Sequence, residues 1–121
     1  QALMVAAAAN HPDAKILADV YHMFRGGSGF EALKMIRGNT LEVFHMNDYT
    51  NKITRLQQKD KDRVYPGDGV APMKQILTDL QNMGGIKVLS IELFNETYWQ
   101  QDPEVVARTG LQKMKRLVAS I

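Results

Sequence analysis

Three side chains that can bind a metal ion lie at or near the ends of short apolar segments. Asp19 follows Ile16-Leu17-Ala18, His45 follows Leu41-Glu42-Val43-Phe44, and Glu92 lies within Val88-Leu89-Ser90-Ile91-Glu92-Leu93-Phe94. Carboxylate oxygens and imidazole nitrogens are ordinary ligands of divalent metals. A carboxylate in an apolar strand is also costly unless it is paired, so Glu92 in particular predicts a cationic partner.

The elements that must position these side chains are three short strands, predicted at residues 15–20, 41–45 and 88–94, the last buried on both faces. Helices are predicted at residues 2–9, about 29–36 with Ser28 as cap, 70–83 ended by Gly84-Gly85, and from Pro103 onward with Asp102 as N-cap. A long polar connection spans residues 47–69. Alternating strands and helices predict an α/β fold with a parallel sheet, in which Asp19, His45 and Glu92 meet at one edge.

The composition is that of one ordinary domain, residues 1–121, with a formal charge of +2 and 45% hydrophobic residues. Basic and acidic residues alternate, as in residues 59–63, so charge gives no support to nucleic acid binding. The absence of cysteine fits a reducing compartment. The longest apolar run, residues 2–9, is too short to span a bilayer and resembles no signal peptide, so we expect a cytoplasmic protein without membrane contact.

Four ordered motifs resemble the C-terminal part of the xylose isomerase-like sugar phosphate isomerase/epimerase family. They are residues 19–22 (DVYH), 45–48 (HMND), 63–69 (RVYPGDG) and 90–92 (SIE). The family has a TIM-barrel fold, and the resemblance implies that the three strands here are its sixth, seventh and eighth. Residues 1–9 would be the end of the fifth helix.

The resemblance also implies a chemistry. The family binds one divalent metal through glutamate, aspartate, histidine and glutamate, of which Asp19, His45 and Glu92 match the last three. This ligand set suits manganese, magnesium, cobalt or zinc. Family members isomerise or epimerise a sugar or sugar phosphate through an enediolate, with Glu92 as the implied general acid/base. His22 and Arg63 would bind substrate oxygens.

Several of these residues also have a structural interpretation. His22 is as compatible with packing or capping of its loop as with substrate contact. Asp48 is a candidate hydrogen-bond partner that orients His45 from outside the ligand set, and turn chemistry is the alternative. Arg63 lies in a run of mixed charge that is typical of a solvated surface, and only the following Pro66-Gly67-Asp68-Gly69 favours a functional role.

The resemblance covers only part of a barrel. The family's first glutamate ligand, on the fifth strand, would precede Gln1, and a complete barrel takes about 250 residues. We therefore expect either the C-terminal portion of a longer barrel or a chain that associates with another, a homo-oligomer included. An exposed strand edge should make the chain dimerise or aggregate.

Two other functions fit the sequence less well. An apurinic-site endonuclease of the same barrel class would assemble three zinc ions, but the chain has three histidines and lacks an aspartate-x-histidine pair after His45. A binding domain or a non-catalytic fragment is the remaining alternative. The number of metal ions held by the purified chain separates the three: one, three or none.

Overall fold

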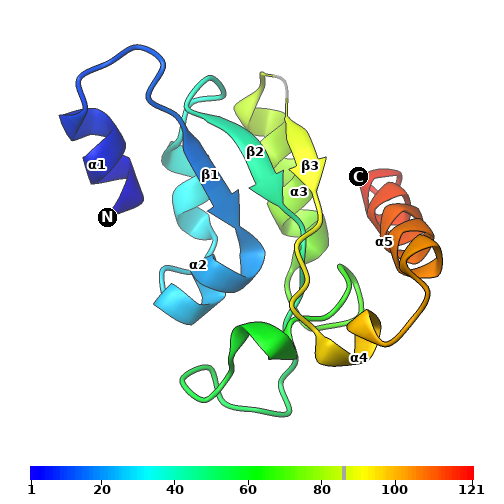
Figure 1. Ribbon diagram of the computed structural model, residues 1–121. Coiled ribbons are helices and arrows are strands. Elements are labelled where there is room, and N and C mark those ends of the chain that lie inside the picture. Colours follow the sequence, from blue (N-terminus) through cyan, green and yellow to red (C-terminus); the bar gives the residue numbers. More distant parts are fainter. Residues whose placement is uncertain (86) are drawn as a thin grey trace.

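Three short parallel strands form the centre of the molecule (Figure 1). The structure is a computed structural model that describes residues 1–85 and 87–121. The strands are β1 (Ile16–Asp19), β2 (Leu41–His45) and β3 (Val88–Ser90), and they lie in the order β1-β2-β3. Both neighbouring pairs are parallel, which confirms the predicted α/β arrangement.

The register of the sheet brings the C-terminal ends of all three strands to one level. Asp19 lies opposite His45, and His45 lies opposite Ser90. Glu92 follows Ser90 by two residues, just beyond the last paired position. The side chains expected at one sheet edge therefore start from adjacent backbone positions.

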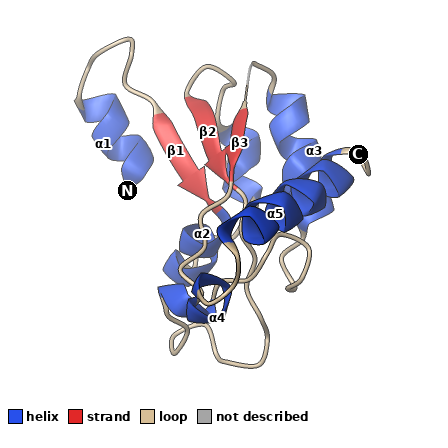
Figure 2. Cartoon of the chain, turned by 45° about the vertical axis from the view of Figure 1, so that its right-hand side comes forward, coloured by secondary structure: helices blue, strands red, loops and turns tan. Residues whose placement is uncertain are grey.

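Helices lie on both sides of the strands and behind them (Figure 1). α1 (Ala2–Ala8) lies beside β1, and α5 (Pro103–Val118) lies on the β3 side. α2 (Val20–Gly26), the 3₁₀ helix η1 (Glu31–Met35) and α3 (Met73–Met83) supply most of the packing behind the sheet. The short helices η2 (Asp60–Asp62) and α4 (Glu96–Trp99) lie beyond the C-terminal ends of the strands, and Figure 2 shows α5 crossing in front after a rotation of 45°.

The hydrophobic core is built on one face of the sheet. Phe44 of the central strand is fully buried, together with Leu33 of η1 and Ile76 of α3. By contrast, Leu17 of β1 is 52% exposed and Val88 of β3 is 55% exposed. The expectation that the third strand is buried on both faces is therefore wrong, because β3 is an edge strand and the described residues do not cover its second face.

Most predicted helix boundaries are confirmed. The carboxylate of Asp102 accepts hydrogen bonds from the backbone N–H groups of Glu104 and Val105 at 2.8 and 3.1 Å, which caps α5. Gly84 and Gly85, which follow α3, have φ values of 75° and 77°, a conformation that other residues rarely adopt.

The segment after β1 differs from the prediction. α2 begins directly after Asp19, in a segment where the sequence predicted no helix, and ends at Gly26. The following residue, Gly27, has a left-handed φ of 74°. The helix predicted at about 29–36 is only the 3₁₀ helix η1. Its N-cap is Phe30, so Ser28 is not the cap.

Candidate metal centre

Asp19, His45 and Glu92 meet at the C-terminal ends of the three strands, as the sequence predicts. His45 Nδ1 lies 3.4 Å from Asp19 Oδ2 and 3.4 Å from Glu92 Oε2. One ligand atom from each of the three residues falls within a cluster whose members all lie within 4.8 Å of one another. The Asp19 side chain is buried, whereas that of Glu92 is 38% exposed and so faces the open side of the cluster.

Asp19 is held by its place in the backbone. It ends β1 and is also the N-cap of α2, where its Oδ1 accepts a hydrogen bond from the backbone N–H of His22 at 2.9 Å. Its Oδ2 accepts from Asn47 Nδ2 at 2.8 Å. With both oxygens bonded, the carboxylate has a fixed orientation.

Arg63, in the long connection between β2 and α3, contacts two residues of the cluster. Its side chain is 1% exposed, and its Nη1 donates to Glu92 Oε2 at 2.9 Å and to Asp19 Oδ2 at 3.2 Å. Its guanidinium carbon lies 4.8 Å from the centre of the Tyr21 ring and 5.0 Å from that of the Phe94 ring. The cationic partner expected for Glu92 is thus supplied, at least in part, by the chain itself.

His22 also contacts Arg63. Its Nε2 lies 3.0 Å from Arg63 Nη2. A guanidinium has only donors, so this nitrogen must be the acceptor and the imidazole is neutral with its proton on Nδ1. His22 and Arg63, the two residues expected to bind substrate oxygens, are therefore adjacent to each other and to the three-residue cluster.

Two residues of this network were not selected from the sequence as site residues. Asp60 Oδ1 accepts from Arg63 Nη2 at 2.6 Å, and Asn47 bonds Asp19. Asp60 lies in the run of alternating charges, and no feature of the sequence distinguishes it from its acidic neighbour there. Asn47 carries a signal in the sequence, because it lies two residues after His45 within the family-like motif of residues 45–48.

Asp48 does not orient His45. Its Oδ1 accepts from the backbone N–H groups of Tyr49 and Ala71, and its Oδ2 accepts from those of Gly67 and Gly69, at 2.8–3.1 Å. No hydrogen bond joins it to His45 in the part of the chain that the structure describes. Burial raises the pKa of this carboxyl against the opposing effect of the four N–H groups. The expectation that Asp48 orients His45 is therefore not met, since its carboxylate holds the backbone of the connecting segment instead.

The donor set fits a divalent ion. Ligand atoms that share an ion with bonds of about 2.0–2.2 Å lie roughly 3.0–3.5 Å apart, and the two distances from His45 Nδ1 are in this range. Asp19 and Glu92 together carry two negative charges, which match the charge of one such ion. Three protein ligands also leave coordination positions for a further ligand or a substrate.

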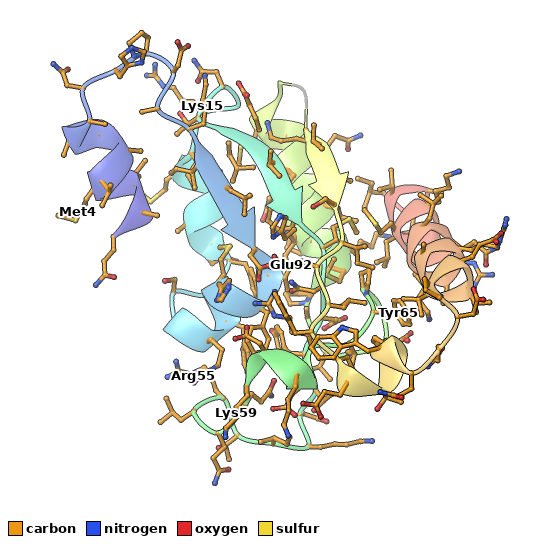
Figure 3. The ribbon with its side chains drawn as sticks, viewed as in Figure 1. Met4, Lys15, Arg55, Lys59, Tyr65 and Glu92 are labelled. Atoms are coloured by element: carbon orange, nitrogen blue, oxygen red, sulfur yellow. The ribbon has the colours of Figure 1, made fainter. Side chains whose placement is uncertain are left out.

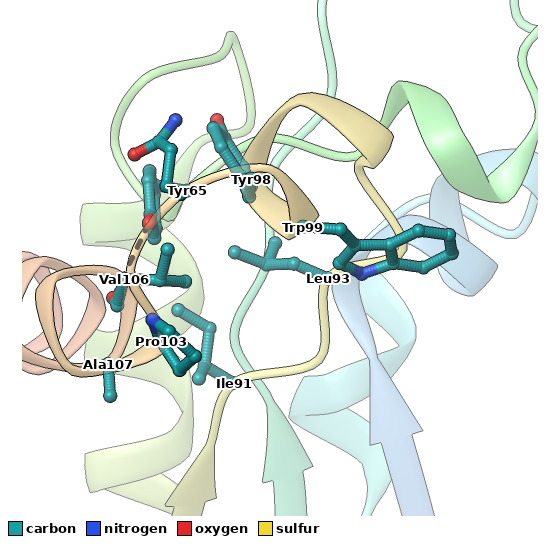
Figure 4. Close-up of a pocket in the computed structure, with 9 residues that line it drawn as sticks. Tyr65, Ile91, Leu93, Tyr98, Trp99, Pro103, Val106 and Ala107 are labelled. Carbon is teal, nitrogen blue, oxygen red and sulfur yellow. Dashed lines mark hydrogen bonds between the residues drawn. The ribbon is translucent and has the colours of Figure 1, made fainter.

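Three cavities lie near the cluster. One of about 560 Å³ is lined by Asp19 and His22 together with residues of α1 and β1. A polar cavity of about 670 Å³ adjoins His22 and Asp60 and is also lined by Tyr21, Gln58 and Lys59. An apolar cavity of about 450 Å³ lies between the segment that follows β3 and the start of α5 (Figure 4). Figure 3 shows Glu92 near the centre of the molecule, far from Lys15 at the opposite end of the strands.

The fold is that of the (β/α) barrel class with a candidate metal site at the strand ends, and the comparison with known families agrees on the fold. The sequence pattern described as "xylose isomerase-like TIM barrel" matches residues 1–117, so the chain belongs to this family. The chain is 29% identical over 119 residues to an inosose isomerase of Bacillus licheniformis, covering 98% of this chain and 42% of that protein.

Solved structures show the same fold. A crystal structure of a protein called IolI, with a bound zinc atom, aligns with a TM-score of 0.89 at 26% identity and covers 97% of this chain and 42% of that one. A xylose isomerase domain protein from Alicyclobacillus acidocaldarius aligns with a TM-score of 0.82 at 25% identity, over 97% and 41% of the two chains. The chain therefore spans less than half the length of these relatives and corresponds to part of a barrel.

None of the helices in the described residues is long and apolar enough to cross a bilayer.

Proposed function

We propose that this chain carries the C-terminal, ligand-bearing part of a metal-dependent sugar isomerase or epimerase. The observation that supports the proposal best is the cluster of Asp19, His45 and Glu92, drawn from three separate strand ends into the spacing of a shared ion. The relatives named inosose isomerase suggest a cyclic polyhydroxy ketone as substrate, and the family resemblance keeps other sugars and sugar phosphates as candidates.

Residues of this chain would both bind the metal ion and take part in the proton transfer. Asp19, His45 and Glu92 would hold manganese, magnesium, cobalt or zinc, which when bound polarises a substrate carbonyl and stabilises the negative charge that develops on its oxygen. Glu92 would serve as one of two general acid/base groups. One glutamate removes the proton from the carbon next to that carbonyl, and the other, which this chain does not supply, returns a proton at the neighbouring carbon or on the opposite face. The partial exposure of Glu92 leaves its carboxylate accessible to a substrate.

Arg63 and His22 complete the arrangement. The guanidinium is held beside two aromatic rings, so it needs no further ordering before it acts. Both of its terminal nitrogens already bond residues at the site, so a substrate oxygen would have to replace one of these partners. His22, with its proton on Nδ1, can donate a hydrogen bond to a hydroxyl group. The neighbouring polar cavity gives room for the remainder of a small polar molecule.

A fourth ligand is expected from outside this chain. The family's additional glutamate lies on a strand that would precede Gln1, so the remainder of a longer protein or a second chain would supply it. Within the described residues, β1 and β3 each have one edge that pairs with no other strand, which favours such an association.

The proposal is tested by metal content and by proton exchange. We expect one divalent ion per chain by elemental analysis. In the protein with its complete barrel, we expect exchange of the proton next to the carbonyl of an inosose in deuterated water, followed by NMR, and Glu92→Gln should nearly abolish this exchange. Glu42→Gln, an exposed change at the other end of β2, is the matched control. Wild-type exchange in the Glu92 variant would remove that residue from the mechanism.

One observation favours a non-catalytic alternative. Arg63 already pairs with both Asp19 and Glu92, so the cluster is also a structural ion-pair network in which the guanidinium balances one of the two negative charges. A chain that holds no divalent ion after incubation with each of the four metals would favour this second interpretation.

A further inference from the structure

One side chain links the C-terminal ends of all three strands. Asn47 follows β2 and is fully buried. Its Nδ2 donates to Asp19 Oδ2, at the end of β1, at 2.8 Å, and lies 3.4 Å from the backbone oxygen of Glu92, beyond β3. Its Oδ1 accepts from the backbone N–H of Tyr21 at 2.8 Å. Both polar atoms of the side-chain amide therefore have hydrogen-bond partners.

The oxygen and the nitrogen of this amide have different roles. The bond from Tyr21 to Oδ1 satisfies a buried backbone donor at the start of α2 and is structural. The bond from Nδ2 to Asp19 acts on a residue of the metal cluster, and only a donor can make it because the carboxylate is an acceptor.

We propose that Asn47 is a positioning residue, which fixes the Asp19 carboxylate so that Oδ2 faces His45 and Glu92. The inference rests on the proposed function insofar as it concerns a metal ion. Arg63 alone would hold Oδ2 less firmly, because its bond of 3.2 Å is the longer one and Nη1 is shared with Glu92. The orientation of Asp19 thus depends on a residue outside the ligand set.

The variant Asn47→Asp separates the two roles. It keeps an acceptor for the Tyr21 N–H but replaces the donor by an oxygen that faces Asp19 Oδ2. Two carboxylates in such contact repel each other, so Asp19 should turn away. Asn51→Asp makes the same change of charge at an exposed position of the same connecting segment and is the matched control.

The first measurement is a zinc titration of the purified chain. We expect Asn47→Asp to lower the affinity for zinc by about 10–100-fold, the usual effect of losing a partner of a metal ligand, while Asn51→Asp leaves it unchanged. Cobalt absorption spectra should change in the same variant only. Circular dichroism verifies that each variant is folded. If Asn47→Asp does not fold, Asn47→Ser takes its place, and we expect the same loss of zinc affinity. Zinc affinity equal to the wild type in a folded Asn47 variant would overturn the proposal.

The second measurement needs no metal. The backbone N–H of His22 donates to Asp19 Oδ1 and therefore reports the orientation of that carboxylate. In ¹H–¹⁵N NMR spectra of the metal-free chain, we expect this amide signal to move and its hydrogen exchange to become about tenfold faster in Asn47→Asp and not in Asn51→Asp. An unchanged His22 amide refutes the role of Asn47, whereas a wild-type chain that takes up no zinc refutes the proposed metal function instead.

Discussion

Replacing Arg63 by methionine would remove the chain's own counter-ion from the cluster. Methionine keeps an unbranched apolar side chain between the rings of Tyr21 and Phe94 but leaves Asp19 and Glu92 without the guanidinium. We expect a stability loss that is large without metal and smaller with it, because a divalent ion can compensate the same two carboxylates.

The magnitude follows from burial. Breaking a buried pair costs about 3–5 kcal/mol. Asp19 is buried but Glu92 is 38% exposed and partly screened by water, so we expect the lower end, about 3 kcal/mol. For a domain of this length, 1 kcal/mol corresponds to roughly 3–6 °C, which gives a fall in Tm of about 9–18 °C.

The assay is thermal and urea unfolding of wild type and Arg63→Met, each without metal and with saturating zinc. The deficit is the difference in unfolding free energy between wild type and Arg63→Met. By linkage, each 1.4 kcal/mol by which zinc reduces this deficit means that the variant binds zinc about tenfold more tightly than the wild type. Arg108→Met, which breaks an exposed pair with Glu104, is the control and should cost about 0–1 kcal/mol in both conditions. An equal deficit with and without zinc, or weaker zinc binding in Arg63→Met, would refute the idea that Arg63 and the metal neutralise the same charges.

Two further predictions concern the segment that Asp48 organises. Gly69→Ala should cost several kcal/mol in urea unfolding, because its Cβ would lie 2.2 Å from the backbone oxygen of Tyr49, whereas Gly26→Ala, with no atom nearer than 3.9 Å, should be almost neutral. Asp48→Asn should cost at least about 2 kcal/mol, since one amide oxygen cannot accept from four N–H groups. The raised pKa of Asp48 means that the folded state binds its proton more tightly than the unfolded state, so this contribution to stability is present at low pH and is lost as the pH rises from 3.8 through the raised pKa. The deficit of Asp48→Asn relative to wild type should therefore shrink over that rise, and a deficit that grows would contradict the burial of this charge.

The convergence of Asp19, His45 and Glu92 could be predicted because it follows from local patterns alone. Apolar segments alternating with amphipathic helices predict parallel strands, and the ends of parallel strands share an edge. The place of each residue near a strand end then determines the site without knowledge of any loop.

The position of Arg63 could not be predicted in this way. It lies in a connection of more than twenty residues without hydrophobic periodicity, and its charged neighbours are typical of solvent exposure. Its burial depends on contacts with Asp19, Glu92 and two aromatic rings, all distant in sequence. α2 was missed for a different reason, since Asp19 was assigned only to the end of a strand although it also starts a helix.

This double use of Asp19 affects how any mutational scan of the protein should be interpreted. An alanine there would lose both the charge and the N-cap, which alone is worth about 1 kcal/mol, so a dead variant would not distinguish failed coordination from a frayed helix. Asparagine retains an oxygen for the His22 amide while giving up the negative charge. A substitution at Asp19 therefore acts through two separate effects, loss of the negative charge and loss of the N-cap of α2. Only a short polar side chain removes the charge while it keeps the N-cap.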